Sequence, residues 1–287
     1  MNTILVTGAT GHFGKATIEF LEKKGLSPLA LVRDHAKAGN LKNIRIGDYN
    51  NYESLVKAFA GVDKLLFVSS NDLENRVQQH DNVVKAAKAA GVKHVVYTSF
   101  LSTNETPMSA IALVADSHQK TEKWLKESGL PYTILKNTLY TEFIPLYIGD
   151  KVLQTGMIYH PAGEGKVAYV LRSEMAELAA NILTSAGHEG KSYRITGDTA
   201  YSFSHIAKII SKASGQTVNY IAPAADDYKK TMKGYGLPEE LITVVTAFAV
   251  ATANGEFDTT DREVETLLGR KPKSVEEFLT EYYSSKS

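Results

Sequence analysis

Residues 4–14 read Ile-Leu-Val-Thr-Gly-Ala-Thr-Gly-His-Phe-Gly, so a short apolar run passes directly into a glycine-rich segment. This order predicts a buried strand, a turn and the start of a helix. Gly8, Gly11 and Gly14 have the spacing G-x-x-G-x-x-G. The missing side chains permit a tight turn, a close approach of the backbone to a pyrophosphate, and close packing of helix on strand. We therefore predict a phosphate-binding site at the N-terminus of this helix.

The three glycines alone are also compatible with ordinary turns, so their surroundings decide between the two interpretations. Phe13, Ile18 and Leu21 are spaced as one apolar face of a helix, and Gly25 marks the end of that helix. Residues 29–32 then predict a second strand. A strand, a helix and a strand in this order form the βαβ unit in which such a motif binds a dinucleotide.

The composition is that of an ordinary globular protein, with 43% hydrophobic and 22% charged residues in a chain of 287. Its 32 basic and 32 acidic residues leave no net charge, so we expect neither a nucleic-acid nor a membrane partner. The absence of cysteine excludes disulfides, thiolate metal sites and a cysteine nucleophile. Because the first strand begins at the N-terminus, we expect no signal segment and a cytoplasmic protein.

Two further features of the sequence concern metals and membranes. The eight histidines show neither H-x-x-x-H nor H-E-x-x-H spacing, so we expect no metal site. The longest weakly polar run, residues 241–253, is too short to cross a hydrocarbon layer of about 30 Å. We expect a buried helix or the wall of a pocket there.

Up to about residue 140, strands and helices alternate. The predicted strands are residues 4–7, 29–33, 44–46, 65–69, 94–99 and 132–135. This alternation predicts an α/β protein with a doubly wound parallel sheet, the Rossmann type. Right-handed crossovers place the carboxyl ends of all parallel strands at one edge, where ligands bind.

Beyond residue 140 this alternation ends. Glycine and proline separate short segments, after which we predict helices at residues 172–185 and 203–214 and strands at 192–196 and 218–221. The last helix, near residues 274–283, has Ser274 and Glu277 at capping-box spacing. We therefore divide the chain into a Rossmann domain, residues 1–140, and a smaller C-terminal α/β lobe for the substrate, residues 141–287, interleaved with it.

The end of the second strand indicates which dinucleotide is bound. Arg33 stands where an acidic residue would accept the ribose hydroxyls of NAD, and Lys37 follows four residues later. Cations at this place suit a 2′-phosphate, so we predict NADPH. Two alternatives remain open: Arg33 is a solvated charge at a strand end, and Asp34 pairs with Lys37 or caps a helix.

Polar residues also follow the next strands at the same edge. Asp48 and Tyr49 suit contact with adenine, although Asp48 is equally suited to cap the following helix. The fourth and fifth strands end in small polar residues where the ribose and nicotinamide should pass. The predicted cofactor contacts there are Ser69, Ser70, Asn71, Thr98 and Ser99.

Several of these segments resemble one known family. Residues 7–14, 31–33, 95–99 and 131–137 are similar to the NmrA-like branch of atypical short-chain dehydrogenases, as are residues 187–191 and 267–270. Within that branch the likeness is greatest to NADPH-dependent type 2 quinone oxidoreductases and triphenylmethane reductases. The resemblance implies NADPH as cofactor and a glycine loop that contacts it through Gly8, Thr10, Gly11, His12, Phe13 and Gly14.

The chain departs from ordinary short-chain dehydrogenases at their Tyr-x-x-x-Lys pair. Aligning on Glu122 puts Val114 at the tyrosine position and His118 at the lysine position. A positioned acid contributes roughly 10² to 10⁴ in rate where the substrate oxygen must be protonated. A quinone yields a phenolate that water can protonate, and a cationic dye needs no proton. The departure therefore favours these acceptors.

We expect the active site where the sixth strand ends. Asn137, Tyr140, Thr141 and Glu142 should contact the nicotinamide, with Asn137 and Tyr140 also catalytic. His118 is the third catalytic candidate, because a histidine of ordinary pKa titrates near neutral pH. The alternatives are that His118 is an ordinary helix residue and that the others are loop residues. Tyr140, Phe143 and residues 241–253 would together form an aromatic pocket.

These observations predict an oxidoreductase that passes hydride from NADPH to a quinone or similar small aromatic acceptor, as a monomer or homodimer. The alternative is a catalytically silent protein that senses NADP(H) and regulates a partner, as regulators resembling this family do. Both share every cofactor-binding feature, and the missing tyrosine and lysine fit either. Turnover of NADPH would separate them.

Overall fold

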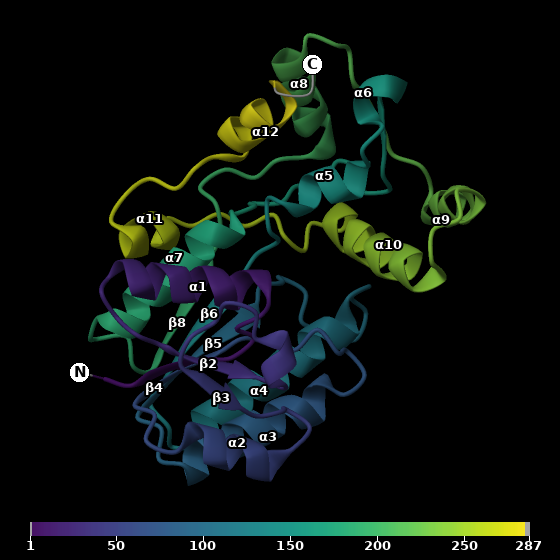
Figure 1. Ribbon diagram of the computed structural model, residues 1–287. Helices are drawn as coiled ribbons and strands as arrows, with labels where there is room; N and C mark the ends of the chain where they lie inside the picture. Colours follow the sequence, from purple (N-terminus) through teal and green to yellow (C-terminus); the bar gives the residue numbers. More distant parts are fainter. Residues whose placement is uncertain (1, 285–287) are drawn as a thin grey trace.

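The computed structural model describes residues 2–284 and is built around one parallel sheet (Figure 1). Its seven strands lie in the order β3-β2-β1-β4-β5-β6-β8, and every neighbouring pair is parallel. The strands are β1 (Ile4–Val6), β2 (Leu29–Val32), β3 (Ile44–Ile46), β4 (Lys64–Phe67), β5 (His94–Phe100), β6 (Tyr132–Asn137) and β8 (Lys191–Ile195). The order 3-2-1-4-5-6 confirms the predicted Rossmann sheet, whose direction of winding changes between β1 and β4.

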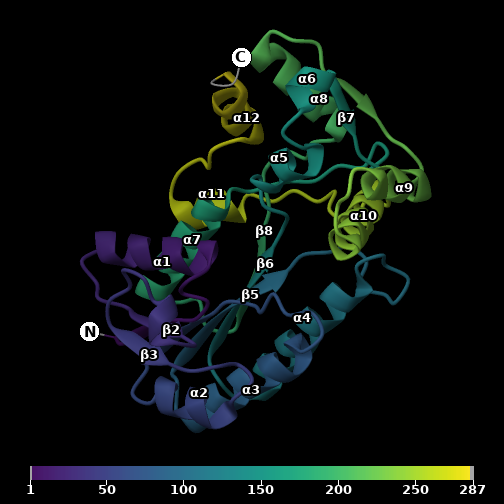
Figure 2. The same ribbon diagram turned by 45° about the vertical axis from the view of Figure 1, so that its right-hand side comes forward.

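Helices cover both faces of this sheet (Figures 1 and 2). One face carries α1 (His12–Lys23), α7 (Arg172–Thr184) and α11 (Glu263–Leu268), and the other carries α2 (Tyr52–Phe59), α3 (Arg76–Ala89) and α4 (Ala112–Glu127). Because side chains alternate along a strand, Ile4 and Val6 pack in the core under α1, whereas Leu5 packs in the core under α2. Burial on both sides explains why β1 and β4 are almost wholly apolar.

The smaller lobe lies above the carboxyl ends of the strands in Figure 1 and has its own core. It comprises α5 (Phe143–Ile148), α6 (Val152–Thr155), β7 (Met157–Tyr159), α8 (Phe203–Ser214), β9 (Asn219–Ile221), α9 (Ala225–Gly234), α10 (Glu239–Ala253) and α12 (Val275–Ser284). Strands β7 and β9 form a two-stranded parallel sheet. The predicted capping box precedes α12: the Glu277 amide donates to Ser274 Oγ at 3.1 Å, and the Ser274 amide donates to Glu277 Oε2 at 2.7 Å.

The chain returns to the large sheet after residue 140. Strand β8, which the sequence suggested for the smaller lobe, pairs with β6, while α7 packs against α1. The division into a domain of residues 1–140 and a lobe of residues 141–287 stays a prediction. Three elements that follow residue 140, namely α7, β8 and α11, pack with the large sheet. Within residues 2–284, no helix combines the length and the apolar character that crossing a bilayer requires.

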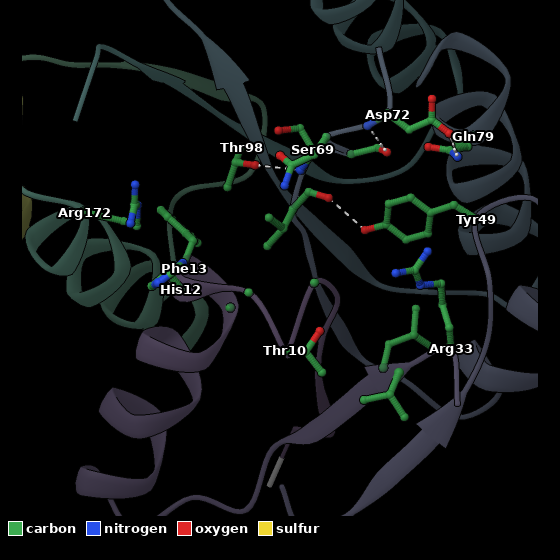
Figure 3. A pocket seen from close by; sticks show the side chains of 18 of the residues that line it. Thr10, His12, Phe13, Arg33, Tyr49, Ser69, Asp72, Gln79, Thr98 and Arg172 are labelled. Carbon is green, nitrogen blue, oxygen red and sulfur yellow. Dashed lines mark hydrogen bonds between the residues drawn. The ribbon is translucent and has the colours of Figure 1, made fainter. Parts of the chain in front are cut away.

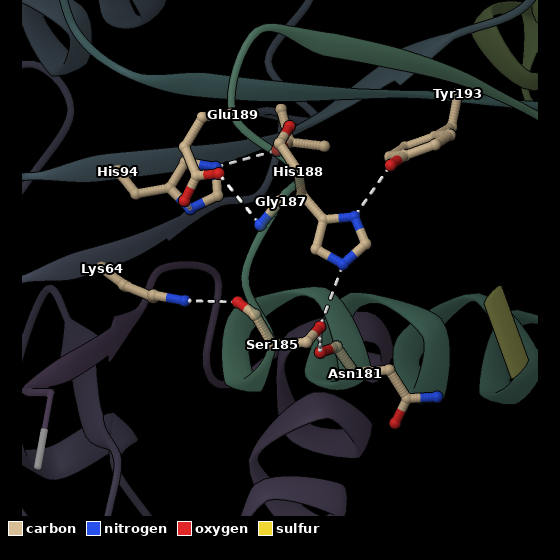
Figure 4. Close-up of polar contacts among 9 residues, drawn as sticks. Lys64, His94, Asn181, Ser185, Gly187, His188, Glu189 and Tyr193 are labelled. Carbon is tan, nitrogen blue, oxygen red and sulfur yellow. Dashed lines mark hydrogen bonds and ion pairs between the residues drawn. The ribbon is translucent and has the colours of Figure 1, made fainter.

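A polar cluster fastens the connection between α7 and β8 to the amino ends of the strands (Figure 4). Lys64 Nζ donates to the Ser185 carbonyl at 3.0 Å, and the Thr133 hydroxyl donates to the His188 carbonyl at 2.7 Å. Because the Thr133 proton is used in this way, its oxygen accepts from His94 Nε2 at 2.8 Å. The unprotonated Nδ1 of His94 then lies 3.9 Å from the Glu189 carboxylate. This cluster holds β8 in place at the amino ends of the strands, and the ligand-binding edge of the sheet lies at their carboxyl ends.

Candidate cofactor-binding cleft and active site

A cleft of about 850 Å³ opens at the carboxyl ends of the strands (Figure 3). The glycine segment, the ends of β2, β4 and β5, and the start of the smaller lobe form its walls. Of the predicted site residues it brings together Gly8, Thr10, Gly11, His12, Phe13, Gly14, Arg33, Ser69, Ser70, Asn71, Thr98, Tyr140 and Glu142. Residues from five separate segments therefore meet where parallel sheets bind ligands.

The glycine segment forms a backbone cradle. Gly8 has a positive φ of 58°, and its carbonyl accepts the Gly11 amide at 2.9 Å. A Cβ on Gly14 would lie 2.3 Å from that same carbonyl oxygen, so only glycine permits α1 to start so close to β1. Gly11 caps α1 without a side chain, which leaves the first amides of the helix open to the cleft. This cradle fits the diphosphate of a dinucleotide.

Arg33 lies at the opposite side of the cleft from Arg172 in the view of Figure 3. It is exposed, and no carboxylate of residues 2–284 forms an ion pair with it. Asp34 does not neutralise it, because its carboxylate accepts the Ala36 amide at 3.0 Å and caps a 3₁₀ helix at His35–Lys37. An unpaired guanidinium at this place fits a 2′-phosphate. Lys37 lies outside the cleft lining, and its predicted phosphate contact stays a prediction.

Tyr49 connects two strand ends beneath the cleft. Its hydroxyl donates to the Val68 carbonyl at 2.8 Å and also contacts Thr7 Oγ1, while the Val68 amide donates to Thr7 Oγ1 at 2.9 Å. Burial raises the pKa of Tyr49 well above its ordinary value, so the hydroxyl keeps its proton. Asp48 also lines the cleft, but the cap of α2 is Asn51, whose side chain accepts the Ser54 amide at 3.0 Å.

The loop after β4 is held by hydrogen bonds from neighbouring elements. The Ser69 amide donates to Thr98 Oγ1 at 2.9 Å, and the Ser70 amide donates to His80 Nε2 at 3.0 Å. Arg76 Nε donates to the Ser70 carbonyl at 2.7 Å. Both polar groups of the Ser70 backbone are thus bound by α3, which fixes this wall of the cleft.

Three predicted contacts lie behind the cleft rather than in its lining. The Ser99 hydroxyl donates to Glu122 Oε1 at 2.6 Å, so this side chain is directed toward α4. Asn137 is 4% exposed, and its Oδ1 has no hydrogen-bond partner within the described chain. Thr141 is 1% exposed, and its amide donates to the Val170 carbonyl at 3.0 Å. Direct contact of these three with a cofactor stays a prediction that the cleft lining does not support.

An aromatic wall closes the cleft at the smaller lobe. The rings of Tyr140 and Phe143 lie 5.4 Å apart, and the side chain of Leu146, which is 71% exposed, extends this apolar surface. Glu142 accepts the Arg172 amide at 3.0 Å and 3.1 Å, one distance to each carboxylate oxygen. The guanidinium of Arg172 lies 4.5 Å from the centre of the Tyr140 ring. Flat rings beside a cation suit an aromatic ligand.

The structure corrects the expectation for His118. Its Nδ1 lies 2.6 Å from the Tyr97 hydroxyl, and its ring stacks on Phe100 at 5.9 Å, outside the cleft lining. Burial, with a smaller effect of the charge on Arg76, holds the pKa of His118 well below its ordinary value. The expectation that it titrates near neutral pH is therefore wrong, and the imidazole is neutral there.

Helix α10 forms the predicted helix at residues 241–253, but it is not among the elements that line the cleft. Its Phe248 lies edge-on to Phe100 at 6.1 Å and stacks with Phe257 at 6.3 Å. The pocket wall expected from this segment is instead supplied by α5, which begins at Phe143. Val114, at the position of the missing tyrosine, packs against the core of the smaller lobe.

The sequence did not indicate several cleft residues. Asn50, Asp72, Gln79, Leu146 and Arg172 line the cleft without belonging to a local motif. Gln79 lies inside α3 and reaches the cleft by donating to Asn50 Oδ1 at 3.2 Å and Asp72 Oδ2 at 3.1 Å. Arg172 reaches it because α7 packs on α1. Neither of these two positions in the cleft can be recognised from the spacing of residues in the sequence.

Residues 1–279 match the model of the NmrA-like family. Quinone oxidoreductase 2 of Escherichia coli K12 is 36% identical over 98% of this chain and 99% of that protein. The NAD(P)H azoreductase of Xenophilus azovorans is 32% identical over 96% of each chain. Both similarities therefore extend over the two lobes.

Solved structures agree with these similarities. The E. coli quinone oxidoreductase in complex with NADPH superimposes with a TM-score of 0.90, covering 98% of this chain and all of that one at 36% identity. The Citrobacter triphenylmethane reductase in complex with NADP(H) also gives a TM-score of 0.90, at 37% identity and with 98% and 100% coverage.

Proposed function

This chain belongs to the NmrA-like family, and we propose that it is an NADPH-dependent oxidoreductase that reduces a quinone or a similar small aromatic acceptor. The observation that carries the proposal is a single cleft with a phosphate cradle and a free arginine at one end and an aromatic wall at the other. Relatives named as quinone oxidoreductase and azoreductase support the same chemistry.

The cofactor end of the cleft would bind through fixed groups. The open amides at the start of α1 would hold the diphosphate, and Arg33 would hold the 2′-phosphate. Tyr49 and the Ser70 loop keep this wall in place before any ligand arrives, because their polar groups are already hydrogen-bonded within the protein. When bound, NADPH supplies the hydride.

At the acceptor end, the chain contributes position rather than acid catalysis. Tyr140, Phe143 and Leu146 offer an apolar surface for a flat ring, and Val114 cannot donate a proton. His118 is neutral and hydrogen-bonded to Tyr97 behind this surface. Such a site suits an acceptor whose reduced oxygen water can protonate. Alignment of the reacting groups would then provide most of the rate enhancement.

The test is the consumption of NADPH, followed by its absorbance, with a panel of quinones, dyes and aldehydes. We expect turnover with quinones and none with simple aldehydes. Replacing Tyr140 by alanine should lower turnover and leave NADPH affinity unchanged, since Tyr140 belongs to the acceptor wall. Silence across the panel, with NADPH shown to bind by fluorescence, would favour the sensor that is the alternative function.

Two further properties belong to this proposal. We place the protein in the cytoplasm, in agreement with its lack of cysteine and of any helix within residues 2–284 able to cross a bilayer. We also expect a monomer or a homodimer, which size-exclusion chromatography with light scattering would test. A larger assembly would contradict this expectation.

A further inference from the structure

Helix α10 carries apolar side chains on more than the face that the smaller lobe buries. Ile242 and Ala249 belong to its buried face. A second apolar row, the α10 stripe, recurs at the helical spacing i, i+3, i+4 and i+7 and consists of Leu241, Val244, Val245 and Phe248. Leu241 is 46% exposed and Val244 is 41% exposed. The outer half of the α10 stripe is therefore apolar surface that the rest of the described chain leaves uncovered.

The inner end of the α10 stripe shows which way it faces. The ring of Phe248 lies edge-on to that of Phe100 at 6.1 Å. Phe100 ends β5 and follows Thr98, which lines the cleft, by two residues or about 7 Å along the strand. In Figures 1 and 2, α10 lies beyond the carboxyl ends of the strands, beside the segment that joins β5 to α4. Because residues seven apart share one face of a helix, Leu241 is turned toward the same edge of the sheet as Phe248.

The α10 stripe thus leads outward from the β5 side of the cleft. Two helical turns separate Phe248 from Leu241, a length of about 10 Å. Residues 241–253 contain no charged side chain, and the glutamates of α10, Glu239 and Glu240, precede the stripe. Its exposed side chains are aliphatic and offer neither a donor nor an acceptor. A narrow row of this kind fits an extended alkyl chain, which binds only by burying its methylene groups.

The start of this path is fixed before any ligand arrives. The ring of Phe257 stacks with Phe248 at 6.3 Å and lies edge-on to Phe100 at 5.9 Å. The preceding residue, Glu256, is buried, and its carboxylate accepts the Ser109 hydroxyl at 2.7 Å. This hydrogen bond joins the segment after β5 to the end of α10. A path that is already formed costs little ordering when a ligand enters it.

We propose that the α10 stripe binds the aliphatic tail of the acceptor, so that the preferred acceptors are quinones with a long alkyl or isoprenoid substituent. This inference rests on the proposed function, because the tail belongs to the molecule that the cleft reduces. The quinone ring would pack at the aromatic wall of the cleft. The tail would leave the cleft past Phe100 and lie along the α10 stripe.

A second copy of this chain is the other occupant that an apolar helix face could take. Leu241 and Val244 are its two largely exposed members, and they present far less than the roughly 800 Å² per partner that a stable interface buries. The contact of the α10 stripe with Phe100, at the strand next to the cleft, also favours a part of the acceptor. Two exposed side chains suffice for one alkyl chain.

The test compares kcat/KM for 2,3-dimethoxy-5-methyl-1,4-benzoquinone and for its 6-decyl derivative, below the concentration at which the latter aggregates. The two acceptors share one quinone ring, and the ratio of their values does not depend on the fraction of enzyme that is folded. In the double variant Leu241→Ser/Val244→Ser we expect the ratio of decyl to short quinone to fall about tenfold relative to wild type. This is the weight of roughly two buried methylene groups.

Met157→Ser/Ile221→Ser is the matched control. It removes two apolar side chains of similar exposure, 38% and 46%, from β7 and β9 of the same lobe. Its ratio should equal that of wild type. An unchanged ratio in Leu241→Ser/Val244→Ser would overturn the inference. An equal fall in both double variants would overturn it too, because the effect would then belong to any apolar surface of the lobe.

A binding measurement separates this inference from the proposed function. Equilibrium dialysis of 4-nonylphenol, which NADPH cannot reduce, against protein saturated with NADP⁺ should show about tenfold weaker binding to Leu241→Ser/Val244→Ser than to wild type and the control. If neither quinone is reduced, the proposed function fails, and the dialysis alone decides whether the α10 stripe binds an alkyl chain. Equal binding to all three proteins would refute the tail site.

Light scattering of the same three proteins tests the other occupant. We expect one oligomeric state for all of them. A change from dimer to monomer in Leu241→Ser/Val244→Ser, with the ratio and the 4-nonylphenol binding of wild type, would overturn the inference and assign the α10 stripe to a subunit interface.

Discussion

Replacing His80 by phenylalanine is expected to loosen the loop of Ser69, Ser70 and Asn71 and so weaken NADPH binding, although His80 itself is fully buried. The Thr121 hydroxyl donates to the Ser117 carbonyl at 2.7 Å, so its oxygen must accept from His80 Nδ1, which lies 2.8 Å away. The proton of His80 is therefore on Nδ1, and Nε2 accepts the Ser70 amide at 3.0 Å. Phenylalanine keeps an aromatic ring but removes this acceptor, together with the Nδ1–H donor to Thr121.

The effect on the loop follows from the hydrogen bond to the Ser70 amide, because the bond to Thr121 does not involve the loop. An amide that loses its buried partner costs about 1–3 kcal/mol, and because this contact is only partly buried we expect about 1–2 kcal/mol. If the loop becomes ordered again only when NADPH binds, this free energy is lost from the free energy of NADPH binding. The affinity for NADPH should then fall by about five- to thirtyfold. Burial lowers the pKa of His80 to about 3, so Nε2 remains an acceptor at neutral pH.

The assay is a fluorescence titration with NADPH, accompanied by urea unfolding. His80→Gln is the control, because its amide oxygen can take the place of Nε2 and should restore most of the affinity. If His80→Phe is destabilised but binds NADPH as tightly as wild type and His80→Gln, then His80 is only a core residue. That result would refute the argument that α3 fixes the wall of the cleft.

Three further outcomes follow from the structure. Gly14→Ala should lower NADPH affinity at least tenfold and the free energy of unfolding by about 1–3 kcal/mol, because its Cβ would meet the Gly8 carbonyl at 2.3 Å. The control is Gly234→Ala, whose Cβ would meet nothing within 4 Å. Arg33→Ala should reduce the preference for NADPH over NADH about tenfold or more in the same titration, and an unchanged preference would contradict the phosphate assignment. Burial lowers the pKa of His94 from 6.5 to about 4, so between these values the unfolded chain binds a proton that the folded chain does not. Stability should thus be complete above pH 6.5 and decline towards pH 4, by about 3 kcal/mol for this residue, and urea unfolding of His94→Gln should show a smaller decline.

The large sheet could be predicted because β1, β4 and β5 are buried on both faces and each is followed by its own helix. The membership of β8 could not be predicted, because only Ile195 of its residues, Lys191–Ile195, is buried, as in an edge strand of either lobe. Its pairing with β6 depends on α7 packing against α1, far away in the sequence. For the same reason β6 extends to Asn137, two residues beyond the predicted end: β5 and β8 continue to pair with it on both sides.

The site was predictable where one strand end supplies it. Gly8 to Gly14 and Arg33 reach the cleft through local geometry, whereas Gln79 and Arg172 reach it through packing between helices. Thr98 and Ser99 were both predicted to contact the cofactor, although they are neighbours on the same strand. Side chains alternate along β5, so only one of these neighbours can face the cleft. Thr98 accepts the Ser69 amide there, and Ser99 is therefore directed to Glu122 on the other side.

The same physical chemistry connects the missing catalytic pair with the choice of acceptor. His118 occupies the lysine position, but it is hydrogen-bonded to Tyr97 and its pKa is held low by burial, so it brings neither charge nor a labile proton to the cleft. Val114, at the tyrosine position, is packed against the smaller lobe. The two positions that provide acid catalysis in ordinary short-chain dehydrogenases thus hold a buried, neutral histidine and a half-buried valine here. In the proposed function, a site built in this way discriminates by the shape of its walls, so we expect the aromatic wall of Tyr140 and Phe143, rather than a general acid, to decide what is reduced.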